Sequence, residues 1–442
     1  GGGGAGVVGV EVGGSLAKGT LVRKDLQDID IFVVFENEDA TKELGGILKK
    51  AKLRGKVKHG SRDYFQIVEG NVIFEIIPVV QVDKKKPEDA ENVTDVSLMH
   101  VDYVKKKIRK NKKLSDEIKL AKVFCHACGC YGAESYIGGL SGYGLEVLVI
   151  YFGGFVKFLK WAVRGGGGFG YSNSRFTFVN DVGPPNSRFT LEDGEKFVES
   201  KSLAHPKIVK SKSLAYLRGV KNKSNNLRSV PLVIDPEKYF KNGNEVLQEL
   251  NASKLQSPLV VVDPTYKFRN ITAGLSYPTF CKFVNYSKKF LKSPSVKMFE
   301  KKEFNISVFE KLAKKKKARL LKLKLTTDRQ EGDIAGTKMK KFFDFLIFKL
   351  KKKEQEVLAG EFVYGGAGQE AEGYLVVKEK KEIEIGGVDS GLRDAVKNFK
   401  KVRKKTYVRG GKVYAKEKVD IDKVLKRANG AGVEMGASMV SF

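Results

Sequence analysis

Gly14-Ser15 precedes the run Asp28-Ile29-Asp30-Ile31-Phe32-Val33-Val34, so a small-residue turn comes before a strand that carries two carboxylates. Side chains at positions i and i+2 of a strand point to one face of the sheet, so we expect Asp28 and Asp30 to converge. Two converging carboxylates repel each other unless a cation lies between them. A turn with free backbone N–H groups and a serine hydroxyl suits a phosphate. The pattern therefore predicts a metal–nucleotide site, in which Mg2+ bridges protein carboxylates and substrate phosphates.

The alternative is a pair of solvent-facing aspartates on an edge strand beside an ordinary turn. Two neighbouring observations argue against it. The residues from Ile31 to Phe35 are all apolar, which is typical of an interior strand. A second apolar run, at residues 72–78, contains one carboxylate, Glu75, and a buried glutamate is costly unless it is paired or bound to a metal. Glu75 beside the two aspartates would complete a three-carboxylate site for two cations.

Further motifs make the chain similar to a known family. The residues above resemble the nucleotidyltransferases of the DNA polymerase β type, and more narrowly the archaeal CCA-adding enzymes, which build the 3′-terminal CCA of tRNA. The matching segments follow the family order from residue 13 to about 295: Gly14–Thr20, His100–Val104, Tyr131–Glu134, Ser141–Tyr143 with Glu146, and Asp263-Pro264 with Arg269-Asn270 and Ala273. The chain departs from the family pattern at three positions: Asp102 stands where the family has Glu, Asp28 where it often has Glu, and Glu75 where it usually has Asp.

The resemblance implies an α+β, multi-domain fold. A catalytic head with a small mixed sheet and helices is expected at residues 1–98, and a mostly helical neck that recognises the nucleotide at 99–295. An α/β body and tail that bind tRNA are expected at 296–442. Residues 164–230 are irregular and contain short repeats, and we assign no chemistry to them.

Local patterns add particular elements to this outline. Residues 37–53 read as one helix in the head. The alternation of apolar and basic residues at 318–325 predicts a strand with a cationic outer face. Gly410-Gly411, between residues 407–409 and 412–415, predicts a hairpin.

The mechanism that the resemblance implies is two-metal nucleotidyl transfer from CTP and ATP. Asp28, Asp30 and Glu75 would be the catalytic residues and would hold two Mg2+ ions. The nucleotide would be bound by Gly14, Ser15, Lys18, His100, Lys122, Tyr131, Asp263 and Arg269.

Several of these residues have an ordinary structural alternative. His100 is one of four histidines and by default has a satisfied structural role. A lysine such as Lys122 is more often a solvated helix residue, and Tyr131 could be part of a core. Arg269 would hydrogen-bond the incoming base, because its planar fork of donors fits the acceptors of C and A. Its alternative is a pairing with a nearby acid that only stabilises the neck.

The charge of the chain favours a nucleic-acid partner. Its 442 residues include 82 Lys and Arg against 52 Asp and Glu, a net charge of +30. Such an excess favours a polyanion, because each neutralised phosphate releases counterions. The alternative is the basic surface of a thermophile or a halotolerant protein. With the family in view, basic clusters at 314–317, 349–353 and 400–405 would hold the acceptor stem and T arm of tRNA.

Three of the four cysteines lie in the run Cys125-His126-Ala127-Cys128-Gly129-Cys130. The spacing is too tight for a usual structural zinc site, so buried thiols at a helix end are favoured over zinc. Without a disulfide framework, a reducing compartment is expected. The sequence has no apolar run of 18 residues and no recognisable signal peptide, so a cytoplasmic protein without a membrane partner is expected.

Two other functions stay open from the sequence. One is another polymerase β-type RNA polymerase, such as a poly(A) polymerase, against which the motifs from His100 to Tyr143 argue. The other is a non-catalytic RNA-binding protein with the same fold, although all three carboxylate positions are filled. The oligomeric state, including a homodimer, is also open.

Overall fold

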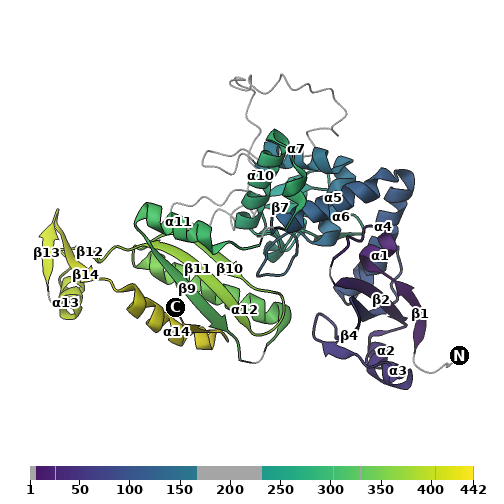
Figure 1. Ribbon diagram of the computed structural model, residues 1–442, viewed down its shortest axis with the longest axis horizontal. Helices are drawn as coiled ribbons and strands as arrows, with labels where there is room; N and C mark the ends of the chain where they lie inside the picture. The colour runs from purple at the N-terminus through teal and green to yellow at the C-terminus, as the bar shows by residue number, and fades with distance from the viewer. Residues whose placement is uncertain are drawn as a thin grey trace. The chain divides into compact units, whose positions relative to one another are not determined.

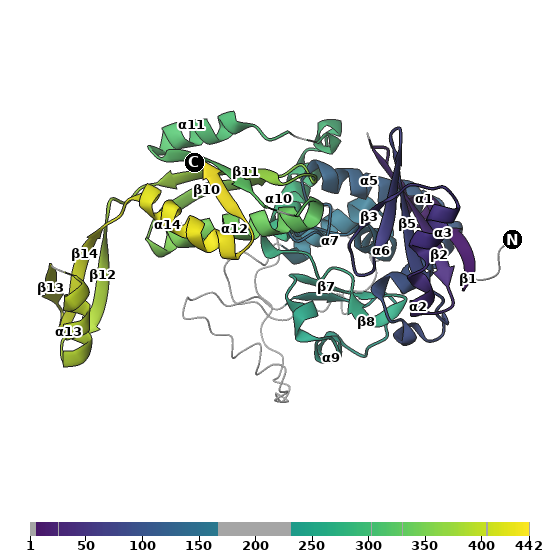
Figure 2. The same ribbon diagram turned by 90° about the horizontal axis from the view of Figure 1, so that it is seen from below.

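The computed structural model describes residues 6–24, 26–166, 231–301, 303–328, 330–403 and 405–441. The chain forms two compact units, one of residues 1–133 and 137–302 and the other of residues 134–136 and 303–442. Figure 1 and Figure 2 show two views of their elements. The first unit contains both the predicted head and the predicted neck, and the boundary between them stays a prediction. Residues 167–230 of the irregular stretch lie outside the described residues.

A five-stranded mixed sheet opens the first unit (Figure 1). Its strands are β1 (Val7–Val12), β2 (Gln27–Phe35), β3 (Lys56–Lys58), β4 (Tyr64–Glu69) and β5 (Val72–Val80). Their order is β1-β2-β5-β4-β3, with β2 and β5 parallel and the other neighbours antiparallel. Because β2 lies between β1 and β5, the strand with the two aspartates is an interior strand, as the apolar run predicted.

The two faces of β2 bury different side chains. Val33 and Phe35 pack in a cluster with residues of α3 (Leu44–Lys50), and α2 (Glu38–Thr41) lies beside them. Phe32 packs on the other face in a cluster that includes Leu98 of α4 (Ser97–Lys110). Asp28 and Asp30 alternate in phase with Phe32, so they belong to the face that α4 approaches.

The single helix predicted at residues 37–53 is wrong, because this segment forms the two short helices α2 and α3. The break falls at Lys42-Glu43, shortly before Gly45-Gly46. Glycine is a poor helix former, and two glycines in the first turn of α3 weaken a continuous helix.

Helices dominate the rest of the first unit. They are α1 (Gly14–Lys18), α5 (Lys113–Ala127), α6 (Gly142–Phe152), α7 (Phe155–Gly166), α9 (Gly243–Glu249) and α10 (Tyr277–Lys292), with short 3-10 turns at Pro87–Asp89, Val93–Val96, Ala252–Leu255 and Val296–Phe299. A three-stranded sheet has the order β6 (Leu232–Ile234), β7 (Leu259–Asp263) and β8 (Tyr266–Asn270). The Phe124 ring lies at the centre of the core, edge-on to Phe155 at 5.2 Å and to Phe283 at 6.3 Å between ring centroids.

Within the described residues, no single helix is both long and apolar enough to cross a membrane. In this part of the chain, α6 and α7 taken together, with a bend of 93° between them, have the length and composition for it.

The second unit contains two antiparallel sheets. The larger has the order β10 (Glu356–Val363), β11 (Glu370–Lys378), β9 (Arg319–Thr326) and β15 (Ser438–Ser441), and its helices are α11 (Ile306–Lys316), α12 (Gly332–Lys352) and α14 (Ile421–Glu434). The smaller has the order β12 (Glu382–Asp389), β14 (Lys412–Lys418) and β13 (Thr406–Arg409), with α13 (Arg393–Val402) beside it.

Both elements predicted from local pattern are present in the second unit. In β9, Leu321, Leu323 and Leu325 are buried and the lysines between them are exposed, which confirms the strand with a cationic outer face. The predicted hairpin is β13–β14, and Gly410 and Gly411 take φ angles of +57° and +71° at its turn. Such angles suit glycine and match the twist of the flanking strands.

A buried ion pair joins the segment just before β4 to the 3-10 turn that precedes α4. The Nη1 atom of Arg62 lies 2.6 Å from Oδ1 of Asp95, whose side chain is fully buried. The same carboxylate accepts the backbone N–H of Val80 at 2.8 Å and of Asn92 at 3.0 Å. Arg62 also pairs with Glu38 of α2 through Nε at 3.1 Å.

Replacing Asp95 by alanine should destabilise the first unit by about 3–5 kcal/mol, because it leaves a buried guanidinium without its main partner. Chemical denaturation monitored by circular dichroism measures this loss. The matched control is Asp39→Ala, which removes an exposed pair with Lys42 and should leave the denaturation midpoint unchanged. Equal effects of the two substitutions would contradict the structural role of Asp95.

Candidate active site

The three predicted carboxylates lie on one face of the first sheet. The parallel register pairs Asp30 of β2 with Glu75 of β5, and parallel partners point to the same side. Asp28, two residues before Asp30, shares that side. The convergence expected from the i, i+2 spacing is therefore present in the backbone.

The Gly14-Ser15 segment rests directly on Asp30. Gly14 starts α1 at a φ angle of +56°, and a Cβ atom at this position would lie 1.6 Å from Oδ2 of Asp30. The neighbouring Gly13 donates its N–H to the Asp30 carbonyl at 2.8 Å. The predicted turn is thus the first turn of a short helix, and a residue without a side chain is required there.

The side chains of the three carboxylates have separate partners. Asp28 Oδ2 lies 3.2 Å from the Lys24 ammonium, and Glu75 Oε1 accepts a hydrogen bond from the Gln66 amide at 2.6 Å. Among the described residues, no group of three His, Cys, Asp or Glu side chains is placed to hold a metal ion. The carboxylates share a face but are not gathered into one cluster.

The electrostatics of Asp30 nevertheless suit a cation. Burial raises the pKa of this carboxyl, and repulsion from Asp28 adds to the effect against the opposing charge of Lys18. A cation at this face would relieve both the desolvation and the repulsion. The donor set, three carboxylates on one sheet face, is one that Mg2+ prefers.

Lys18 and Lys122 share one buried carboxylate. Glu146 of α6 has no exposed side-chain surface and lies 2.7 Å from Nζ of Lys18 and 2.8 Å from Nζ of Lys122. Thr20 donates its hydroxyl to Glu146 Oε1 at 2.6 Å. Both predicted phosphate ligands are therefore held by Glu146 here, and Lys122 is buried rather than solvated.

A second polar cluster contains three more predicted residues. His100 Nε2 lies 3.0 Å from Oδ2 of Asp263, and Arg269 Nη1 lies 3.2 Å from His100 Nε2 and 3.5 Å from the same Asp263 oxygen. Tyr143 donates to the other Asp263 oxygen at 3.1 Å and stacks on the His100 ring at 3.9 Å. The structure thus brings together His100, Asp263 and Arg269 across β7, β8 and α4.

Burial controls the charges of this cluster. It lowers the pKa of His100, while the contact with Asp263 opposes that change. Burial alone would raise the pKa of Asp263, but His100 and Arg269 outweigh it and hold the pKa below its usual range. The Arg269 side chain keeps 27% of its surface exposed, so it can still reach a ligand while it pairs with Asp263.

The last predicted residue, Tyr131, stacks on His126 with 3.9 Å between ring centroids. His126 was not among the predicted site residues. It lies four residues after Lys122 on α5 and therefore on the same helix face. Burial lowers the pKa of His126 to about 4, and Lys24, Lys301 and Lys122 contribute to the shift. The three neighbouring cysteines are buried near the end of α5.

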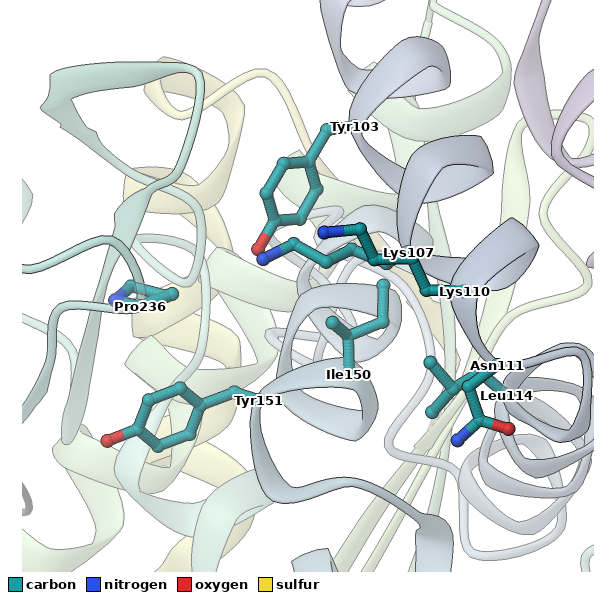
Figure 3. Close-up of a pocket in the computed structure, with 8 residues that line it drawn as sticks. All are labelled: Tyr103, Lys107, Lys110, Asn111, Leu114, Ile150, Tyr151 and Pro236. Carbon is teal, nitrogen blue, oxygen red and sulfur yellow. The ribbon is translucent and has the colours of Figure 1, made fainter. Parts of the chain in front are cut away.

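One cavity of the first unit, of about 310 Å3, contains none of the predicted site residues (Figure 3). It is lined by Tyr103, Lys107, Lys110, Asn111, Leu114, Ile150, Tyr151 and Pro236.

Comparison with known proteins agrees with the ordered motifs. The family model described as tRNA nucleotidyltransferase, second domain, matches residues 116–167 and 215–300. The CCA-adding enzyme of Nanoarchaeum equitans is 29% identical over 354 residues, which are 79% of this chain and 69% of that enzyme. The CCA-adding enzyme of Methanocaldococcus jannaschii is 25% identical over 74% of this chain and 59% of that enzyme.

A solved structure of a cytoplasmic RNA terminal U-transferase aligns with a TM-score of 0.39 at 15% identity, over 67% of this chain and 86% of that chain. The chain spans about two thirds or less of the length of the two archaeal enzymes named above. The chain is thus similar to archaeal CCA-adding enzymes along most of its length, and residues 116–167 and 215–300 match the second domain of tRNA nucleotidyltransferases.

Proposed function

We propose that this protein adds CCA to the 3′ end of tRNA from CTP and ATP, without a template, and releases pyrophosphate. The observation that carries the proposal is the sheet face with Asp28, Asp30 and Glu75, on which Gly14 rests without room for a side chain. The similarity to the two archaeal CCA-adding enzymes supports the reaction class.

Asp28, Asp30 and Glu75 would hold two Mg2+ ions. When bound, these cations would lower the pKa of the tRNA 3′-hydroxyl and offset charge on the triphosphate. To hold them, Asp28 would give up its contact with Lys24, and Glu75 its contact with Gln66. The contact of Asp28 with Lys24 is about half exposed, so rotation of these side chains would free the carboxylate.

The chain's own cations and donors bind the nucleotide. Lys18 and Lys122 lie beside Asp30 and Glu146 respectively and bind the phosphates, together with Ser15 at the start of α1. Arg269 is fixed by Asp263 and His100 while its outer surface stays accessible, so it offers its remaining donors to the incoming base. His100 and Tyr131 act near the ribose and phosphates.

The tRNA is held by backbone contacts on the basic surfaces. Lys314–Lys317 at the end of α11 are exposed, and the end of α12 at 349–353 adds a second cluster. These clusters suit the acceptor stem and T arm, because duplex RNA bound by its phosphates needs positive charge without sequence reading. We place the enzyme in the cytoplasm, where its thiols stay reduced.

The experiment that tests the function offers the protein a tRNA lacking CCA with labelled CTP and ATP. Two cytidines followed by one adenosine are expected. Repeated addition of AMP alone would instead indicate a poly(A)-type polymerase, and binding without addition would indicate a non-catalytic RNA-binding protein.

Substituting Asp30 by asparagine should abolish incorporation of CTP and ATP alike, because both nucleotides use one set of carboxylates. The affinity for tRNA, measured by filter binding, should be nearly unchanged. Asp63→Asn, which alters an exposed aspartate of the same unit, serves as the control and should keep full activity. If the Asp30 variant still added either nucleotide, the assignment of Asp30 as a ligand of the catalytic Mg2+ ions would be wrong.

Arg269→Lys should preserve the metal chemistry but relax discrimination against UTP and GTP. A lysine is a point donor without the fork, and losing one good polar contact removes about 1–3 kcal/mol, which is roughly tenfold to a hundredfold in selectivity. Single-nucleotide incorporation of all four triphosphates measures it, with Arg109→Lys on the exposed face of α4 as control. A lowered melting temperature with unchanged selectivity would show that Arg269 only pairs with Asp263.

The affinity for tRNA should fall steeply with salt, by roughly a thousandfold or more between about 50 and 200 mM if six or more phosphates are contacted. It should depend little on the sequence of the acceptor stem. Fluorescence anisotropy over a salt series measures both. A flat salt dependence would contradict binding through the phosphate backbone.

A further inference from the structure

Glu146 is the centre of a buried charge cluster that ties three helices to the loop after α1. Its carboxylate meets Lys18 at the end of α1, Lys122 in the middle of α5 and the hydroxyl of Thr20, all between 2.6 and 2.8 Å. The side chains of Lys18 and Lys122 are 9% and 4% exposed, and that of Glu146 is not exposed at all. The Glu146 carboxylate is therefore shut off from bulk solvent, and its direct partners are Lys18, Lys122 and Thr20.

The donors of Lys122 are used completely. Its ammonium group faces Glu146 Oε1 at 2.8 Å, the Thr20 carbonyl at 3.1 Å and the Thr20 hydroxyl at 3.1 Å. An ammonium group has three N–H donors and all three have an acceptor here, so a phosphate that binds Lys122 has to replace one of the two Thr20 acceptors. Lys18 has one such contact, with Glu146, and its ammonium also lies 5.7 Å from the centre of the Tyr143 ring.

The cluster carries an excess positive charge, because one carboxylate balances two ammonium groups. Burial would raise the pKa of Glu146, but the two lysines outweigh it and hold the pKa below its usual range. Burial lowers the pKa of Lys122 despite the opposing effect of Glu146. The two pKa shifts have one cause: Glu146 interacts with two cations, whereas Lys122 shares a single anion with Lys18.

We propose that Glu146 is a positioning residue for the nucleoside triphosphate: it pairs with both Lys18 and Lys122 and so fixes their ammonium groups, that of Lys18 near Asp30 of the carboxylate strand. The proposal rests on the proposed function, which places both lysines on the phosphates. Glu146 does not touch the nucleotide. Its negative charge offsets the cost of burying two ammonium groups before the substrate binds. The phosphates then bind to cations that are already positioned.

Without Glu146, the two ammonium groups would share a buried space in which Asp30, on the side of Lys18, is the remaining carboxylate. Lys122 would lose its anionic partner, and keeping such an ion buried costs several kcal/mol, so Lys122 releases its proton above neutral pH. A bound triphosphate restores the counter-charge, and the lysine then takes a proton up again. Triphosphate binding by a variant without this carboxylate should therefore be coupled to proton uptake.

Other groups around the lysines do not mimic this coupling. His126 stays neutral over this range, because its pKa is held near 4, and burial lowers the pKa of His100, which faces Lys18. The remaining charged and titratable groups that face the two lysines are Lys24, Asp30 and Tyr143. All of them are unchanged in the variant below.

The test compares the whole protein with its Glu146→Gln variant. CTP with Mg2+ is titrated by calorimetry at about pH 8.5 in two buffers of different ionisation enthalpy, which gives the number of protons taken up. The variant should take up close to one proton more than the unaltered protein. The KM of the variant for CTP and ATP should rise with pH, by up to about tenfold per pH unit. The KM of the unaltered protein should not change over the same pH range.

Glu117→Gln is the matched control. It changes a partly buried glutamate on α5 that accepts the Phe155 backbone N–H at 2.6 Å and contacts neither lysine. This variant should show loss of stability without any change in proton uptake. If Glu146→Gln lowers only the melting temperature, as this control does, Glu146 is merely structural and the proposal is overturned.

A milder variant covers the case in which Glu146→Gln does not fold. Thr20→Val has nearly the same size, and it removes both the hydroxyl that donates to Glu146 and one acceptor of Lys122. It should shift proton uptake in the same direction by a smaller amount, and no shift would overturn the proposal. If the unaltered protein binds CTP but adds no CCA to tRNA, the proposed function fails, while the proton count still tests Glu146.

Discussion

The missing side chain of residue 14 is the constraint on which the whole site depends. Gly14 lies so close to Asp30 that any Cβ atom would overlap its carboxylate. Because α1 can rest on β2 only in this way, the helix carries Lys18 to one side of the carboxylates and Thr20 to the edge of the helical layer. The contact of one glycine with one aspartate thus sets the distance between the predicted metal face and the buried lysines.

The local parts of the fold were predictable because their signals are local. A strand shows its faces through a period of two residues, which identified β2, β9 and the convergence of Asp28 with Asp30. The parallel register of Asp30 with Glu75 was anticipated only through the lone carboxylate in an apolar run. Strand β10 was missed because Glu356–Val363 does not alternate cleanly, and α14 was missed although Asp420 caps its first turn.

The partners of the site residues were not predictable from spacing. Motif order placed Lys18, Lys122 and Glu146 in the family pattern, but nothing in the sequence says that the two lysines share one acid. The pairing arises from how three helices pack, and side-chain identity alone does not encode that packing. His126 is different, since its position one helical turn after Lys122 was a usable signal. The cluster of His100, Asp263 and Arg269 likewise joins residues far apart in the chain.

The parallel pairing of β2 with β5 also bears on how the protein folds. The antiparallel pairing of β4 with β5 closes across the short turn between Glu69 and Val72, so that hairpin can form early and locally. The pairing of β2 with β5 must wait until α2, α3 and the hairpin have come together, since it encloses all of them. In a nascent chain, Asp30 and Glu75 would therefore come side by side only in a late step. The predicted metal-binding face would be among the last features of the sheet to form.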